Sequence, residues 1–331
     1  MILVAIPEPL RSRILPSSLV DQLRATAPVA VAPTPDDLLA GDTRALLAEA
    51  QVLVTGWGSD LVDAEVLAAA PRLRAVVHTA GSVRPVVTRD VYARGVAVSS
   101  QAWANALPVA EYTLAMILLA AKGVPRARDR YWAVRGGVDV HELLAGHGTY
   151  QAQVGIIGAS VIGRRVIELL APFDLNVALF DPTLGADEAA ALGTTLMSLD
   201  ELMRTSQVVS LHAPWLPSTE GMIGAAELAS LPDGSTFINT ARGALVDEPA
   251  LVRELQTGRI DAVLDVTWPE PPAPDSPLWT LPNVTLTPHV AGSVGNELER
   301  MGASAVREVA RVVRGEPLHH AVDADVYDRL A

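Results

Sequence analysis

Residues 154–165 read VGIIGASVIGRR, and this stretch decides the fold class. It starts with the Val/Ile pattern of a buried β-strand, passes through a turn of small residues and continues into a helix. Similar apolar runs alternate with Ala/Leu/Arg/Glu segments of helical period along the whole chain. Strands that are apolar on both faces and alternate with helices predict a parallel sheet with helices on both sides. The chain is therefore predicted to be an α/β protein with doubly wound sheets.

The expected elements are short runs separated by turn residues. Strands are expected at residues 2–6, 52–55, 74–78, 96–99, 153–157, 177–181, 208–212, 236–240, 262–266 and 284–287. Helices are expected at residues 60–69, 112–121, 164–170, 198–203 and 249–255. Ser198, with Glu201 three positions later, fits a capping box at one of these helix starts.

Two stretches interrupt this alternation. Residues 125–151 are rich in Arg, Gly and His and lack a clear period, so an irregular surface excursion is expected there. Residues 268–277 read WPEPPAPDSP, which excludes a helix or a central strand. On composition alone, this second stretch is a rigid connecting loop.

The glycine turn comes close to three known motifs and departs from each of them. The dinucleotide fingerprint G-x-G-x-x-G finds its first and last glycines in Gly158 and Gly163, while Ser160 takes the middle position. A nucleophile elbow centred on Ser160 needs glycine where Ile162 stands, and a P-loop needs lysine where Arg164 stands. Only the dinucleotide motif keeps the positions on which its mechanism depends. A tight turn without a ligand is the alternative for this stretch taken alone.

The strand expected after this turn ends in Asp181, 18 residues beyond Gly163. Dinucleotide-binding folds place an acid about 20 residues after the glycine turn, where it binds the adenosine ribose hydroxyls. A carboxylate there repels a 2′-phosphate, and Pro182 rather than a basic residue follows it. This pattern predicts NAD in preference to NADP. A strand-terminal Asp that caps a turn is the alternative.

Length and composition exclude several classes of protein. The 331 residues suggest two domains, and a net charge of −13 without a basic cluster disfavours a nucleic-acid or polybasic membrane partner. The chain has no cysteine, which removes disulfides, thiolate nucleophiles and Cys-ligated zinc, and its histidines lack zinc-site spacing, so no metal is expected. Neither a basic leader nor a long enough apolar span is present, so a cytoplasmic protein is expected.

Three reactive side chains follow expected strands in the last third of the chain. They are Arg242, Glu270 in the Pro-rich loop, and His289. Ligands of open α/β sheets bind outside the carboxyl ends of the strands, so these three side chains could converge on one ligand. Each alone has an ordinary structural explanation, such as a surface ion pair or a hydrogen-bonded histidine.

Taken together, in order and spacing, these segments resemble the D-isomer-specific 2-hydroxyacid dehydrogenase family, which includes D-lactate, phosphoglycerate, glyoxylate/hydroxypyruvate and formate dehydrogenases. The resemblance runs over nearly the whole chain. The segments that carry it are NALPVAEY at 105–112, the turn at 155–163, SLHAP at 210–214, and residues 239–243, 265–271 and 287–292. The turn with Ser160 is similar to a G-A-S-x-I-G form found in one bacterial branch of the family.

The resemblance implies hydride transfer between NAD and C2 of a D-2-hydroxy acid or 2-oxo acid. It makes His289 the general acid and base, Glu270 the carboxylate that orients its imidazole, and Arg242 the cation for the substrate carboxylate. Histidine suits this role because it ionises near neutral pH, and a planar guanidinium binds a carboxylate through two hydrogen bonds. The expected partner is a small anionic 2-oxo or 2-hydroxy acid.

A second anchor for that carboxylate is implied in the loop at residues 79–83. The substrate-binding residues expected there are Gly81, Ser82 and Val83, acting through backbone N–H groups. Residues 84–86 read RPV, where many family members have an Asp/Asn-rich turn, which puts the substrate in doubt rather than the reaction. Trp57 and Trp268 are expected to face the substrate.

The resemblance also implies a set of cofactor-binding residues. They are Gly158, Ser160, Val161, Ile162, Gly163, Asp181, His212, Ala213, Pro214, Thr219, Thr240, Ala241, Asp265 and Gly292. Within this set, the N–H groups of Val161 and Ile162 are expected to meet the pyrophosphate at a helix start. Asp265 is expected to bind the nicotinamide carboxamide.

Nested domains and a homodimer are implied as well. A Rossmann-type NAD-binding domain at residues 103–288 is expected inside a smaller, flavodoxin-like substrate-binding domain made of residues 1–102 and 289–331. The apolar helix at 109–121 with the adjoining excursion is expected to form the dimer surface. An NAD(H)-sensing regulator without catalysis, like the corepressor relatives of this family, is the alternative to an enzyme.

Overall fold

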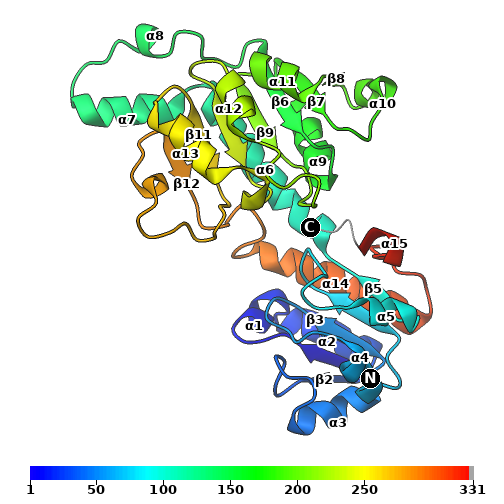
Figure 1. Ribbon diagram of the computed structural model, residues 1–331. Coiled ribbons are helices and arrows are strands. Elements are labelled where there is room, and N and C mark those ends of the chain that lie inside the picture. Colours follow the sequence, from blue (N-terminus) through cyan, green and yellow to red (C-terminus); the bar gives the residue numbers. More distant parts are fainter. Residues whose placement is uncertain (328–331) are drawn as a thin grey trace. The chain divides into compact units, whose positions relative to one another are not determined.

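The computed structural model describes residues 1–327, and the chain forms two compact units (Figure 1). The first unit comprises Met1–Asn105 with Ser293–Ala331, and the second comprises Ala106–Gly292. The chain therefore leaves the first unit, builds the whole of the second, and then returns to the first.

Over its described residues, the first unit contains five strands and seven helices. Its strands are β1 (Ile2–Ala5), β2 (Val29–Val31), β3 (Val52–Thr55), β4 (Ala75–His78) and β5 (Ala97–Ser99). Its helices are α1 (Leu10–Ile14), α2 (Ser17–Thr26), α3 (Gly41–Glu49), α4 (Ala64–Ala69), α5 (Arg89–Ala93), α14 (Glu297–Arg314) and α15 (Ala324–Tyr327).

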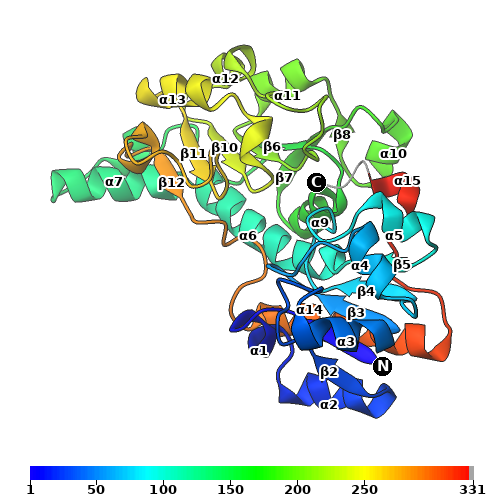
Figure 2. The same ribbon diagram turned by 60° about the horizontal axis from the view of Figure 1, so that its bottom comes forward.

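All strands of the first sheet run parallel in the order β2-β1-β3-β4-β5, which is the flavodoxin-like order. Successive side chains of β1 alternate between two hydrophobic cores, one on each face of the sheet. Leu3 and Ala5 pack with α3, α4 and α5, whereas Ile2 and Val4 pack with α1, α2 and α14 (Figure 2). Because both faces are covered, β1, β3 and β4 are apolar along most of their length.

The second unit contains a larger sheet. Its strands are β6 (Ala152–Ile157), β7 (Leu175–Phe180), β8 (Thr195–Leu196), β9 (Val208–Leu211), β10 (Thr236–Asn239), β11 (Asp261–Leu264) and β12 (Val284–Leu286). Its α-helices are α7 (Val124–Val134), α8 (Val140–Leu143), α9 (Val161–Leu170), α10 (Ala186–Ala191), α11 (Leu199–Thr205), α12 (Ala225–Ser230) and α13 (Glu248–Gln256). Two 3₁₀ helices cover Gly243–Leu245 and Pro277–Trp279, and α6 (Ala102–Ala121) enters from the first unit.

The second sheet is also parallel throughout, in the order β12-β11-β10-β9-β6-β7-β8. Numbered from β6, this is the Rossmann order with one further strand at its edge, and the order in which strands are added to the sheet reverses between β6 and β9. Leu202, Leu228 and Leu251 pack on one face, and Ile117 and Val166 pack on the other. The predicted fold class, two doubly wound α/β sheets, is confirmed.

The differences from the predicted elements have identifiable causes. The short strands β2 and β8 were not expected, since three and two residues leave too little pattern to detect. The excursion at 125–151 was predicted to be irregular but contains α7 and α8. Neither helix buries a residue, so neither carries the apolar stripe by which a helix is recognised.

The expected helix at 60–69 begins only at Ala64, because the Asp63 carboxylate caps it.

Helix α6 alone among the described helices is long and apolar enough by composition to cross a membrane. Half of its most apolar window is buried, and core helices of water-soluble proteins meet the same criterion. Ala110, Ile117 and Ala121 of this helix belong to the apolar core of the second unit.

Candidate active site

Several candidate residues of the second unit lie at the carboxyl ends of neighbouring strands. His212 directly follows β9, Thr240 follows β10, Asp265 follows β11, and His289 comes three residues after the end of β12. The carboxyl ends of parallel strands meet at one edge of a sheet, where open α/β folds bind their ligands. The sheet therefore brings these side chains to a common edge.

His289 and Glu270 are in direct contact at this edge. The Nδ1 atom of His289 lies 2.7 Å from Oε1 of Glu270, and the two side chains are 49% and 41% exposed. A carboxylate accepts the Nδ1 proton, so Nε2 is the ring nitrogen left for exchange with a ligand. His289 has a φ of 54°, a left-handed conformation that is uncommon outside glycine and is often found at functional sites.

Asp265 holds the loop that carries His289. Its buried carboxylate accepts hydrogen bonds from the Thr287 hydroxyl at 2.6 Å, the Val290 N–H at 2.8 Å and the Ala291 N–H at 2.9 Å. The His289 N–H also donates to the Asp265 backbone carbonyl at 2.9 Å. A carboxylate has about four acceptor positions, so this set leaves about one for a ligand such as the expected carboxamide.

Arg242 occupies a tight turn after β10. The Asn239 side chain closes this turn, since it donates to the Arg242 carbonyl at 2.9 Å and accepts the Ala241 N–H at 3.0 Å. Burial lowers the pKa of Arg242, and the negative charge of Glu270 opposes this shift. In the described part of the chain its guanidinium donates to the Ala241 carbonyl and forms no ion pair, which leaves donors for an anion.

Gly243 brings the Arg242 turn against the loop that precedes Glu270. A Cβ atom at position 243 would lie 2.0 Å from the carbonyl carbon and oxygen of Thr267. Only glycine permits this approach, so the two loops that carry Arg242 and Glu270 pack backbone against backbone.

The glycine turn has the form that a dinucleotide site needs. Gly158 has a φ of 95°, and a Cβ at Gly163 would lie 2.1 Å from the Gly158 carbonyl oxygen. Ser160 serves as the N-cap of α9, where its hydroxyl accepts the Gly163 N–H at 3.3 Å. The side chain in the middle position of the fingerprint is therefore turned to the helix, and the first N–H groups of α9, from Val161 and Ile162, have no partner within the helix.

Asp181 lies next to this turn, directly after β7. Its carboxylate accepts the Ala159 N–H at 2.7 Å, together with the N–H and hydroxyl of Thr183 at 2.9 and 2.6 Å. Burial alone would raise the pKa of Asp181, but these hydrogen bonds and the charge of Arg164 together lower it. The sequence showed no basic residue after Asp181, whereas the fold brings Arg164 of α9 into its electrostatic range.

The other expected cofactor residues line the same edge. His212 is fully buried, with Nε2 2.9 Å from the Ser210 hydroxyl, and burial lowers its pKa to about 3. The Thr240 hydroxyl lies 3.1 Å from that of Thr113, and the Thr219 hydroxyl donates to the Pro214 carbonyl at 2.6 Å. Of the remaining expected residues, Ala213 and Ala241 are buried and Gly292 is partly buried.

The loop at residues 79–83 lies in the first unit, after β4. In the described part of the chain, the N–H groups of Gly81, Ser82 and Val83 donate to no protein acceptor, which suits an anion-binding loop. His78, at the end of β4, is buried and contacts the Thr55 hydroxyl at 3.0 Å. Burial lowers the pKa of His78 to about 4, opposed in part by a hydrogen bond with the Ser82 backbone.

Three supporting residues received no role from the sequence. Asn239 shapes the Arg242 turn, Tyr112 of α6 places its hydroxyl 3.0 Å from that of Thr287, and Arg164 lies near Asp181. Asn239 and Tyr112 both lie within segments that carry the family resemblance, so their positions were visible although their contacts were not.

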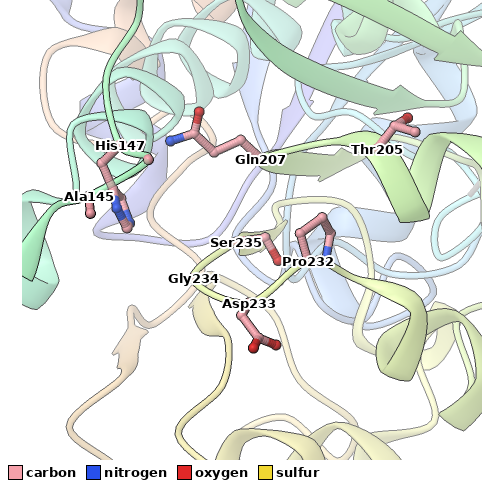
Figure 3. A pocket seen from close by; sticks show the side chains of 9 residues that line it. Ala145, His147, Thr205, Gln207, Pro232, Asp233, Gly234 and Ser235 are labelled. Atoms are coloured by element: carbon pink, nitrogen blue, oxygen red, sulfur yellow. The ribbon is translucent and has the colours of Figure 1, made fainter.

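A cavity of about 210 Å³ lies elsewhere in the second unit (Figure 3). His147, Gln207 and Ser235 line it, and Gln207 and Ser235 each precede the first residue of a strand. It is therefore at the amino edge of the sheet, opposite the candidate site. Among the described residues there is no group of three or more His, Asp or Glu side chains that could hold a metal ion.

Comparisons with known proteins all match this chain to 2-hydroxyacid dehydrogenases or reductases. The model of the family described as "D-isomer specific 2-hydroxyacid dehydrogenase, NAD binding domain" matches residues 114–291. D-3-phosphoglycerate dehydrogenase of Archaeoglobus fulgidus is 32% identical over 263 residues, which cover 79% of this chain and 49% of the relative. Glyoxylate reductase of Korarchaeum cryptofilum is 33% identical over 273 residues, which cover 81% of either chain.

A solved structure agrees with these matches. D-lactate dehydrogenase of Aquifex aeolicus, complexed with NAD and lactic acid, is 27% identical with a TM-score of 0.71, covering 95% of this chain and 96% of that chain. The chain spans about half the length of the phosphoglycerate dehydrogenases that it matches.

Proposed function

This chain belongs to the D-isomer specific 2-hydroxyacid dehydrogenase family, and we propose that it is an NAD(H)-dependent oxidoreductase that interconverts a 2-oxo acid and a D-2-hydroxy acid. The observation that carries this proposal is the 2.7 Å contact between His289 and Glu270 at the sheet edge that also holds Arg242. When bound, NAD(H) supplies or accepts the hydride.

The proposed proton donor and acceptor is Nε2 of His289. In the reducing direction it gives a proton to the carbonyl oxygen of the 2-oxo acid, and in the oxidising direction it removes that proton from the hydroxyl. Glu270 keeps the Nδ1 proton in place, so Nε2 stays directed to the ligand. Arg242 binds the substrate carboxylate. The N–H groups of Ser82 and Val83 in the first unit, which the family resemblance assigns to substrate binding, stay a prediction.

The residues around the glycine turn fit a dinucleotide. The close approach at Gly163 leaves no room for a side chain, and the N–H groups of Val161 and Ile162 suit a pyrophosphate. A ribose hydroxyl suits Asp181, whose carboxylate disfavours a 2′-phosphate, so NAD is the proposed cofactor in preference to NADP. Parallel assays with NADH and NADPH test this preference, and equal kcat/KM values for the two cofactors would contradict it.

A screen of 2-oxo acids tests the proposed reaction. Purified protein should oxidise NADH in the presence of at least one of glyoxylate, pyruvate, hydroxypyruvate and phenylpyruvate. His289→Ala should lower turnover about 10²- to 10⁴-fold with little change in NADH affinity. His141→Ala, at an exposed histidine of α8, is the matched control and should keep full activity.

Two results would refute the proposal. Activity of His289→Ala equal to that of the unchanged protein would remove this residue from proton transfer. Tight NADH binding without any turnover, together with redox-dependent association with another protein, would favour a regulator on the same fold.

We also propose a homodimer formed through the second unit. Helix α7 buries none of its own residues, and Tyr131 and Trp132 on it are 61% and 70% exposed. Figures 1 and 2 both show this helix extending away from the sheet of its unit. Exposed aromatic side chains of this kind mark protein interfaces. Light scattering should give twice the chain mass, and Trp132→Glu should reduce it to a monomer; a monomer without the substitution would contradict the proposal.

A further inference from the structure

Two indole rings, Trp215 and Trp268, lie on loops that follow strands of the candidate site, and of these two only Trp268 was expected to face the substrate. Trp268 follows β11 and Trp215 follows β9, and their ring centroids are 5.2 Å apart at an interplanar angle of 61°. This edge-to-face arrangement is favourable for aromatic side chains. Trp268 is 56% exposed although it packs against Trp215, so the pair presents apolar surface to solvent or to a ligand.

Hydrogen bonds hold the loops that carry both rings. The backbone N–H of Trp268 donates to the Glu248 carboxylate at 2.9 Å, and Thr267 closes the same turn through a 2.8 Å bond to the Pro269 carbonyl. The turn around Trp215 is closed by Thr219, whose hydroxyl donates to the Pro214 carbonyl and accepts the Leu216 N–H. Aromatic side chains on loops fixed in this way are largely prearranged for binding.

The pair lies near the reacting groups. Trp268 stands two residues before Glu270, so their Cα atoms are within about 7 Å of each other. The close approach of Gly243 to Thr267 places the residue after Arg242 against the residue before Trp268. The loop that carries Trp268 therefore packs against the turn that carries Arg242 and continues directly into Glu270.

The charges around the pair are mostly negative. Glu248 accepts the Trp268 N–H, Glu220 accepts the Trp215 indole N–H at 3.4 Å, and Glu270 is two residues away. Arg242 is already matched to the carboxylate of the substrate. A second anionic group on the substrate would need a cation of its own, and these acids would repel it.

We propose that the Trp215–Trp268 pair binds the substituent on C3 of the 2-oxo acid and selects substrates in which that substituent is uncharged and apolar or aromatic. The inference rests on the proposed function and narrows its substrate class. A phosphorylated substituent is excluded, in contrast to the substrate named by the phosphoglycerate dehydrogenases that the chain resembles.

Three 2-oxo acids and NADH test this inference. Phenylpyruvate carries an aromatic substituent, 3-phosphohydroxypyruvate carries a phosphate, and glyoxylate carries no substituent. The unchanged protein should use phenylpyruvate with a kcat/KM at least about 100-fold above that for 3-phosphohydroxypyruvate. Trp268→Ala should lower kcat/KM for phenylpyruvate about 10-fold or more and leave that for glyoxylate within about threefold, because only the former loses its contact.

Further variants separate specificity from folding. Trp268→Phe should recover most of the phenylpyruvate activity, since it keeps an aromatic face. Trp279→Ala is the matched control, because this exposed indole lies in the 3₁₀ helix that follows the Pro-rich stretch and outside the pair. It should leave the ratio of phenylpyruvate to glyoxylate activity unchanged.

The outcomes are distinguishable. A preference for 3-phosphohydroxypyruvate, or an unchanged phenylpyruvate-to-glyoxylate ratio in Trp268→Ala, would overturn the inference while the proposed reaction stands. A raised KM for NADH with an unchanged ratio would assign the indoles to the cofactor and would overturn it too. Absence of turnover with every 2-oxo acid would refute the proposed function itself, and the inference with it.

Discussion

The substitution Asp265→Asn tests how the His289 loop is held. The Asp265 carboxylate is 2% exposed and accepts three hydrogen bonds, two at Oδ1 and one, from the Ala291 N–H, at Oδ2. Asparagine keeps one oxygen for Thr287 and Val290. Its amide NH₂ group then faces the Ala291 N–H, so that two hydrogen-bond donors oppose each other in a buried environment.

The expected cost follows from these contacts. One charge-assisted hydrogen bond, worth about 1.5–3 kcal/mol, is lost, and a buried N–H is left without an acceptor, so we expect a destabilisation of about 2–4 kcal/mol. For a unit of this size, each kcal/mol lowers the unfolding midpoint by about 2–4 °C. The midpoint should therefore fall by roughly 5–15 °C.

Thermal unfolding and amide hydrogen exchange measure this effect. Exchange at Val290 and Ala291 should accelerate, and kcat should fall because His289 lies within the loosened loop. Asp174→Asn, at an exposed carboxylate of the same unit, is the matched control and should shift the midpoint by no more than about 1 °C. A midpoint and exchange rates in Asp265→Asn that equal those of the control would refute the reasoning.

Three further outcomes are expected. Gly243→Ala should lower the unfolding midpoint far more than Gly137→Ala, because a Cβ meets backbone at 2.0 Å in the first and nothing within 4 Å in the second. His212 stays neutral in the folded protein down to about pH 3 but protonates near pH 6.5 when unfolded. The free energy of unfolding therefore falls by roughly 1.4 kcal/mol per pH unit as the pH drops below 6.5. Urea unfolding of His212→Gln should show a shallower pH dependence between pH 6 and 4, and a slope equal to that of the unchanged protein would contradict this. Burial raises the pKa of Asp261 even though Arg126 lowers it, so Arg126→Met should destabilise the protein more at pH 7 than at pH 4.5, as measured by the same unfolding experiments.

Most strands of the fold were predictable, because a strand that is buried on both faces consists of a run of apolar residues. The run at 52–55 matches β3, and the other expected strands differ from the observed ones by one or two residues at their ends. Helix α7 was missed for the opposite reason. None of its residues is buried, so no apolar period marks it.

The candidate site was predictable in its residues but not in its contacts. The resemblance named Glu270 and His289, and the structure places them 2.7 Å apart. The bonds from Asp265 to the loop at 287–291 span more than 20 residues of chain, and Arg164 reaches Asp181 only through the packing of α9. No local pattern encodes either arrangement, because both depend on strand order and helix docking.

Glu270 acts on His289 chiefly by holding its ring. The two side chains are 41% and 49% exposed, and water screens ion pairs at such exposure to about 0–1 kcal/mol. The 2.7 Å contact at Nδ1 instead decides which ring nitrogen carries the proton and leaves Nε2 for the ligand. Asp265 holds the residues on both sides of His289, through the Thr287 hydroxyl and the backbone N–H groups of Val290 and Ala291. His289 is therefore constrained both at its backbone and at its imidazole ring, so the orientation needed for proton transfer is present before a substrate binds.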